Sequence, residues 1–66
     1  MQHDTETYTL PCAFIRESEK AVLITDISTG ENLWIPLSQI KEMHKDPTGV
    51  GRIVMTAWIA KQKDLI

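Results

Sequence analysis

Short runs of apolar and β-branched residues alternate with turn-forming residues along most of this chain, and this pattern restricts it to a small antiparallel β fold. Residues 12–16 and 20–26 are two such runs, and the polar stretch 17–20 lies between them. Two strand-like runs with a short polar gap predict a β-hairpin. Because the second run is apolar without alternation, we expect a strand covered on both faces, with Leu23 in the core.

Turn residues divide the rest of the chain. Residues 26–31 predict a turn in which Gly30 adopts a positive φ, and residues 46–49 predict another. Pro36 has no N–H for a sheet ladder, so the third strand must end there or lie at an edge. The segment that follows, residues 36–40, predicts a tight bend or one 3₁₀ turn. The strands predicted after the hairpin cover residues 32–35, 40–44 and 51–55.

The C-terminal segment carries a helix signal. Thr56 stands where an N-cap belongs, and residues 57–65 are rich in good helix formers. Trp58, Ile59 and Leu65 share one helical face with Gln62, which predicts that Trp58 is buried, together with Phe14 from the first strand. We therefore expect an α+β or mostly β fold of about five short antiparallel strands, forming a small barrel-like or bent sheet that a short C-terminal helix closes. Residues 1–6 are expected to be a flexible polar start, and residues 7–66 one domain.

Size and composition narrow the classes of function. A chain of 66 residues removes only about 60% of its surface from water on folding, which leaves little scaffold for a rigid catalytic site. Nine acidic and seven basic residues give a net charge of −2, the wrong sign for an obvious nucleic-acid binder. The polar, acidic start does not resemble a signal peptide, and no apolar run approaches the roughly 20 residues of a membrane span. A single cysteine excludes an internal disulfide, so we expect a cytoplasmic protein.

No group of residues predicts catalysis or a cofactor. Cys12 and His44 form the one Cys–His combination, but the apolar neighbours of Cys12 favour a buried, unreactive thiol. No His or Cys pair has the close spacing of a metal site. The Gly49–Val50–Gly51–Arg52 stretch lacks the frame of a phosphate-binding loop and indicates a simple turn. We expect a protein that is not an enzyme and that uses no cofactor or metal.

Residues 20–24, 30–31, 33–40 and 57–60 resemble a group of small phage and prophage proteins. The shared centre is Trp34–Ile35–Pro36, a variable residue, then Ser38–Gln39; Leu37 stands here where the group often has Lys. The resemblance covers roughly residues 12–66. It implies a mobile-element protein of a bacterial host, in a size class that includes anti-CRISPR proteins and other inhibitors of host defence.

Two binding functions remain open. The first is a protein-binding module that covers a surface of a host protein or complex, with a rim of acidic turn residues that accelerates association. The second is a small nucleic-acid-binding barrel, in which Trp34 and Tyr8 stack on bases and Arg16, Lys20, Lys41 and Arg52 line a groove. The sequence does not decide whether Trp34 is buried, and it does not fix the oligomeric state. The candidate partner-binding residues are Glu17, Glu19, Asp26, Glu31 and Trp34.

Overall fold

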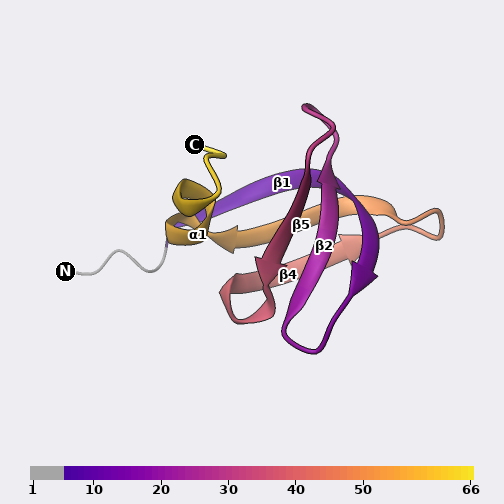
Figure 1. The fold of residues 1–66 in the computed structure, drawn as a ribbon, viewed down its shortest axis with the longest axis horizontal. Helices are drawn as coiled ribbons and strands as arrows, with labels where there is room; N and C mark the ends of the chain where they lie inside the picture. The colour runs from indigo at the N-terminus through magenta and orange to yellow at the C-terminus, as the bar shows by residue number, and fades with distance from the viewer. Residues whose placement is uncertain (1–5) are drawn as a thin grey trace.

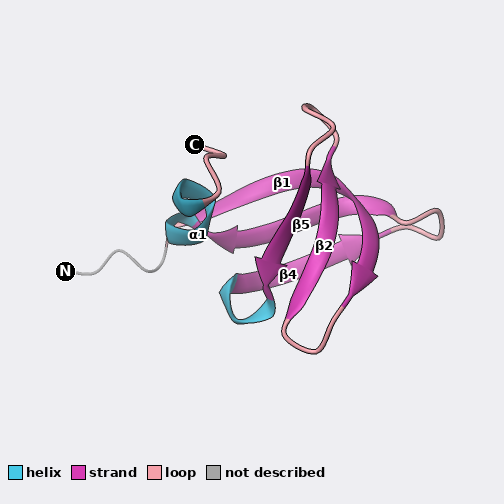
Figure 2. Ribbon diagram, in the orientation of Figure 1, coloured by secondary structure: helices cyan, strands magenta, loops and turns pink. Residues whose placement is uncertain are grey.

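The computed structural model describes residues 6–66, which form five strands, one 3₁₀ turn and one short helix (Figures 1 and 2). All five predicted strands are present, and residues 36–40 contain the predicted 3₁₀ turn. The elements in chain order are β1 (Thr7–Glu17), β2 (Ala21–Asp26), β3 (Asn32–Pro36), η1 (Leu37–Gln39), β4 (Ile40–Lys45), β5 (Val50–Thr56) and α1 (Ala57–Gln62).

The strands form one antiparallel sheet in the order β3-β2-β1-β5-β4, and the long strand β1 lies at its centre. The first part of β1 pairs with β5, from Thr7 to Ala13, and its second part pairs with β2, from Cys12 to Glu17. A bulge between Phe14 and Arg16 interrupts the second ladder, and bulges increase the twist and bend of a strand. Figure 1 shows the resulting shape, in which the two halves of the sheet cross. The sheet is bent but not closed into a barrel, because β3 and β4 remain its edges.

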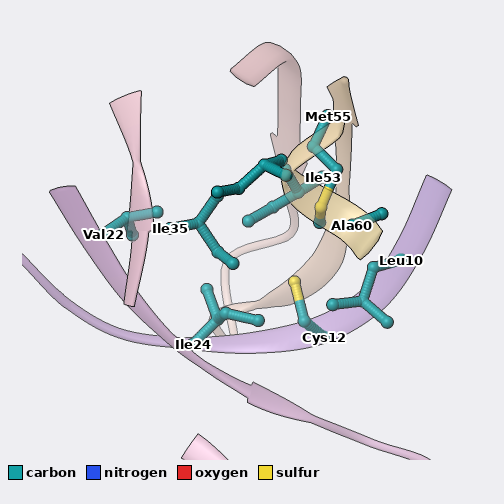
Figure 3. Close-up of a cluster of buried hydrophobic side chains, with 9 residues drawn as sticks. Leu10, Cys12, Val22, Ile24, Ile35, Ile53, Met55 and Ala60 are labelled. Atoms are coloured by element: carbon teal, nitrogen blue, oxygen red, sulfur yellow. The ribbon is translucent and has the colours of Figure 1, made fainter. Parts of the chain in front are cut away.

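The hydrophobic core fills the concave side of this bent sheet. Buried side chains of β1, β2, β3, β5 and α1 converge there (Figure 3). Cys12, Ile24, Ile35, Ile53, Met55 and Ala60 have no exposed surface. Cys12 belongs to the short segment of β1 that pairs with both β2 and β5. It therefore has a paired strand on each side, and its side chain points into the core. The remaining core members are Leu10, Val22 and Ile59.

The turns form for the reasons that the sequence indicates. Gly30 and Gly49 both have positive φ, 78° and 92°, and each ends a turn that an aspartate begins. The Asp46 carboxylate accepts hydrogen bonds from the backbone N–H of Thr48 (2.9 Å) and Val50 (3.1 Å), which fixes the turn between β4 and β5. Asp26 begins the other turn, and its backbone carbonyl accepts from the Gly30 N–H at 2.7 Å.

The helix is shorter than predicted, and its buried face agrees with the predicted one only at Ile59 and at Leu65, which packs against the core from beyond the helix end. Thr56 is the N-cap, as expected, and its hydroxyl accepts from the Ile59 N–H. The helix ends at Gln62, where the Leu65 N–H bonds to the Ala60 carbonyl and Asp64 adopts φ 60°. Ile59 and Ala60 face the core, whereas Trp58 is 59% exposed, so its predicted burial is wrong. A single short helix covers only one end of the core, and Ile59 and Ala60 already fill the space beneath it.

Strand β2 is covered on one face only, contrary to the prediction of two covered faces. Its burial alternates strictly: Val22, Ile24 and Asp26 are buried, and Ala21, Leu23 and Thr25 are half-buried. Leu23 is therefore not a core residue, because residues 6–66 form no second layer on the convex side of the sheet. Phe14 was also expected in the core; it is only partly buried, and the Lys45 ammonium lies 5.6 Å from its ring centroid.

The N-terminal segment contacts the helix at Glu6. The predicted flexible start lies outside the described residues except for Glu6, whose carbonyl accepts a hydrogen bond from the Ala57 N–H. Within residues 6–66, no helix has the length and hydropathy of a membrane-spanning segment.

Candidate functional site

The convex side of the β3-β2-β1 half carries an uncovered apolar surface. The buried residues of β2 and β3 point inward, so the alternate residues lie on the opposite, outer face. The strand register places Trp34 opposite Leu23 and Pro36 opposite Ala21, and Ala13 lies opposite Thr25. We call the five apolar side chains on this face the outer-face patch: Ala13, Ala21, Leu23, Trp34 and Pro36.

Trp34 is the most exposed member of the outer-face patch. It is 42% exposed at the centre of β3, while Ile35 beside it has no exposed surface. A hydrogen bond of 2.8 Å from the Thr25 hydroxyl to the Asn32 side-chain oxygen lies on the same face, two residues along the strands from Leu23 and Trp34. The structure thus answers the question that the sequence left open, since the indole lies on the outside. Large exposed aromatic side chains are typical of binding surfaces.

Acidic side chains lie at both ends of the outer-face patch. Glu19 belongs to the tip between β1 and β2, next to the pair formed by Ala21 and Pro36. Glu31 lies at the other end, directly before β3. Glu17 ends β1 opposite the buried Val22, so its side chain lies on the inner face of the sheet and not beside the patch. All three are exposed, and none makes an ion pair within residues 6–66, where the one such pair joins His44 and Glu42. The arrangement is an apolar centre with charged ends.

Asp26 does not belong to this rim. It was expected to project from a turn, but it is only 4% exposed, and its carboxylate accepts hydrogen bonds from the backbone N–H (2.9 Å) and the hydroxyl (2.8 Å) of Ser28. A carboxylate that holds its own turn in this way has a structural role. The error arises because residue 26 is the last inward-facing position of β2 as well as the first residue of the turn.

The cations expected to line a nucleic-acid groove do not gather around one aromatic surface. Arg16 lies opposite Leu23, in the same row as Trp34. Arg52 belongs to the other half of the sheet, where it pairs with Pro11 and His44. Tyr8, the second proposed stacking residue, is half-buried and packs against the core. Arg16 and Lys20 lie in the half of the sheet that carries Trp34, with Lys20 directly before Ala21, whereas Lys41 and Arg52 lie on β4 and β5.

Cys12 and His44 lie on opposite faces of the sheet. Cys12 points into the core, whereas His44 is exposed on β4 and bonds to Glu42 at 2.8 Å. Burial, together with the neighbouring Asp26 carboxylate, raises the pKa of the Cys12 thiol to about 11. The predicted packing role of Cys12 is confirmed, and the thiol is held in its neutral form. Among residues 6–66, no three His, Cys, Asp or Glu side chains lie close enough together to hold a metal ion.

One small cavity of about 80 Å³ lies beside the β1 bulge, lined by Phe14, Ile15, Arg16, Glu17, Val22 and Lys45. Val22 is a core residue, so the cavity reaches the edge of the core where the two halves of the sheet separate. Ile15, the extra residue of the bulge, is 49% exposed.

No protein family, curated protein or solved structure matches this chain. The resemblance to phage and prophage proteins, and the setting that it implies, therefore stay predictions.

The sequence reasoning identified Trp34 but missed the other four members of the outer-face patch. A signal for them was present: Ala21, Leu23 and Thr25 alternate with Val22, Ile24 and Asp26, and only one of these sets can face the core. The continuous apolar run concealed this period of two.

Proposed function

We propose that this chain is a non-enzymatic protein-binding module, and that it acts by covering a surface of a partner protein with its outer-face patch. The observation that carries the proposal is Trp34, 42% exposed at the centre of an apolar face that no element of the described chain covers. Buried aromatic anchors inside a polar rim supply most of the binding energy in many protein interfaces.

The charge around the patch is mixed and not basic, which fits a protein partner better than a nucleic acid. Glu19 and Glu31 lie at its two ends without ion-pair partners in the described chain, while Arg16 lies in the Trp34 row and Lys20 lies beside Glu19. Acidic side chains repel a phosphate backbone, but they steer a protein surface that carries Lys or Arg. The phage origin and the host-defence target implied by the resemblance fit an occluding module of this kind and are part of the proposal.

The test compares the two exposed tryptophans. Proteins from nuclease-treated lysate of the source organism are captured on the wild type, on Trp34→Ala and on Trp58→Ala, and are then identified by mass spectrometry. We expect Trp34→Ala to lose a partner that Trp58→Ala retains, because Trp58 is equally large and more exposed but lies outside the patch. Retention by Trp34→Ala, or loss in both variants, would overturn the proposal.

A second measurement uses the rim. With the captured partner in hand, Glu19→Lys/Glu31→Lys should slow association and weaken its salt dependence, since it removes steering charges at both ends of the patch. The wild type is also titrated with single-stranded oligonucleotides at low salt. Micromolar binding that falls steeply as salt rises, and that tightens in the double Lys variant, would show that the partner is a nucleic acid.

A further inference from the structure

The two edges of the sheet are protected to different degrees. Strand β4 carries ionisable side chains at Lys41, Glu42, His44 and Lys45, and a bulge between Ile40 and Glu42 interrupts its ladder. Strand β3, with the sequence Asn–Leu–Trp–Ile–Pro, has no ionisable side chain, and its ladder with β2 has no bulge. Charges and bulges are the usual means by which edge strands avoid pairing with other chains. The β4 edge has both, whereas the protection of β3 is limited to its short length and Pro36 at its end.

The register of β2 and β3 decides which backbone groups β3 presents at its free edge. The Asp26 N–H donates to the Glu31 carbonyl and the Leu37 N–H donates to the Lys20 carbonyl, both at 2.8 Å, one at each end of the ladder. Hydrogen-bonded pairs alternate with non-bonded ones in an antiparallel ladder, so Leu33 and Ile35 direct their backbone groups toward β2. Asn32, Trp34 and Pro36 therefore direct theirs outward. Pro36 is tolerated there because the internal ladder does not need its missing N–H.

We infer that the free edge of β3 pairs with β3 of a second copy of this chain, antiparallel and centred on Trp34. Trp34 is the third of the five residues of β3, so a two-fold axis beside it aligns the strand with itself. The Trp34 backbone then exchanges both hydrogen bonds with Trp34 of the partner subunit. The Asn32 N–H donates to the carbonyl of Pro36 of the partner subunit, and the symmetric bond forms at the other end.

This self-pairing brings no like charges together, because β3 carries none. It also aligns the faces of the two sheets: Leu33 and Ile35 stay on the inner face, and the two Trp34 side chains become neighbours on the outer face. The two outer-face patches join into one continuous surface. Dimerisation and partner binding are separate properties, and either can hold without the other.

The first test measures mass in solution as a function of concentration, by light scattering or sedimentation. The wild type should approach twice the chain mass of 7.5 kDa. Trp34→Glu and Trp34→Lys should each remain monomeric, because two identical charges would face each other across the two-fold axis. An equimolar mixture of the two variants should recover the dimer, because opposite charges then face each other. A wild type that stays monomeric at about 1 mM overturns the inference, as does a mixture that does not associate.

The second test fixes the register in a Cys12→Ala background. Hydrogen-bonded antiparallel pairs have Cα atoms about 5.5 Å apart, within the range of a disulfide. Mild oxidation should therefore crosslink Trp34→Cys into a dimer. The matched control is Glu42→Cys, an exposed position on the charged edge strand, which should stay monomeric. Equal crosslinking of both variants, or of neither, contradicts pairing at β3, and circular dichroism of each variant checks that the fold is retained.

Discussion

Cys12 and Asp26 lie directly opposite each other in the ladder between β1 and β2, both on the inner face of the sheet and both buried. Asp26 uses its carboxylate to hold the following turn through Ser28. The same carboxylate adds to the effect of burial on the thiol, because a second negative charge beside it is unfavourable. One residue thus closes a turn and helps to keep its cross-strand neighbour neutral.

The first prediction follows from the raised pKa of Cys12. The pKa lies near 9 in the unfolded chain and at about 11 in the folded protein, so the unfolded state releases its proton first. The stability that the neutral thiol contributes is complete below pH 9 and is lost as the pH rises toward 11. Urea unfolding at several pH values should show this loss in the wild type and a smaller one in Cys12→Ala. Thiol labelling should be slow in native buffer and fast in denaturant; rapid native labelling would mean that the thiol is accessible.

The second prediction concerns the helix. Ile59→Ala should lower the free energy of unfolding by about 2–4 kcal/mol, because Ile59 is only 5% exposed and its truncation leaves a cavity. Trp58→Ala, one residue earlier, should change it by less than about 1 kcal/mol, because the indole is mostly in water. Thermal or urea unfolding of the two variants measures the difference. Equal destabilisation by both would show that the indole is part of the core.

The third prediction concerns Gly51 in β5, which lies opposite Lys45 of β4. A Cβ atom at this position would overlap the His44 backbone carbonyl, and backbone cannot rotate away as a side chain can. Gly51→Ala should therefore displace β4 and lower stability by about 1–3 kcal/mol. The control is Arg52→Ala, an exposed position on the same strand, which should have little effect. Matching urea midpoints for Gly51→Ala and the wild type would contradict the close approach of the two strands.

The fourth prediction concerns the end of the helix. Asp64 has a φ of 60°, a left-handed conformation that is costly for a residue with a Cβ atom. The Leu65 N–H bonds to the Ala60 carbonyl and the Asp64 N–H to the Lys61 carbonyl, which is the motif in which helices favour glycine. Asp64→Gly should raise stability by about 0.5–1 kcal/mol. Asp64→Ala should give no such gain; if both variants stabilise equally, charge rather than backbone conformation is the cause.

Local signals were sufficient for much of the fold. Pro36, Gly30 and Gly49 mark places where only certain backbone geometries are possible, and Thr56 has the hydroxyl that a helix N-terminus needs. These preferences act over a few residues, so the strands, the turns, the 3₁₀ segment and the start of the helix could be predicted from the sequence alone.

The placement of side chains relative to water depended on the tertiary structure. Leu23 and Trp58 are apolar residues in apolar segments, yet both lie outside the core, because a single bent sheet and a helix of six residues can cover only one face. Asp26 is polar and yet buried, because the register of β1 and β2 places it opposite Cys12 on the inner face of the sheet. Strand pairing determines which face of the sheet packs on the core and which face contacts water, and pairing joins residues that are distant in the chain. The sequence therefore determined what each segment forms, and the tertiary structure decided that Trp34 and its neighbours form a surface.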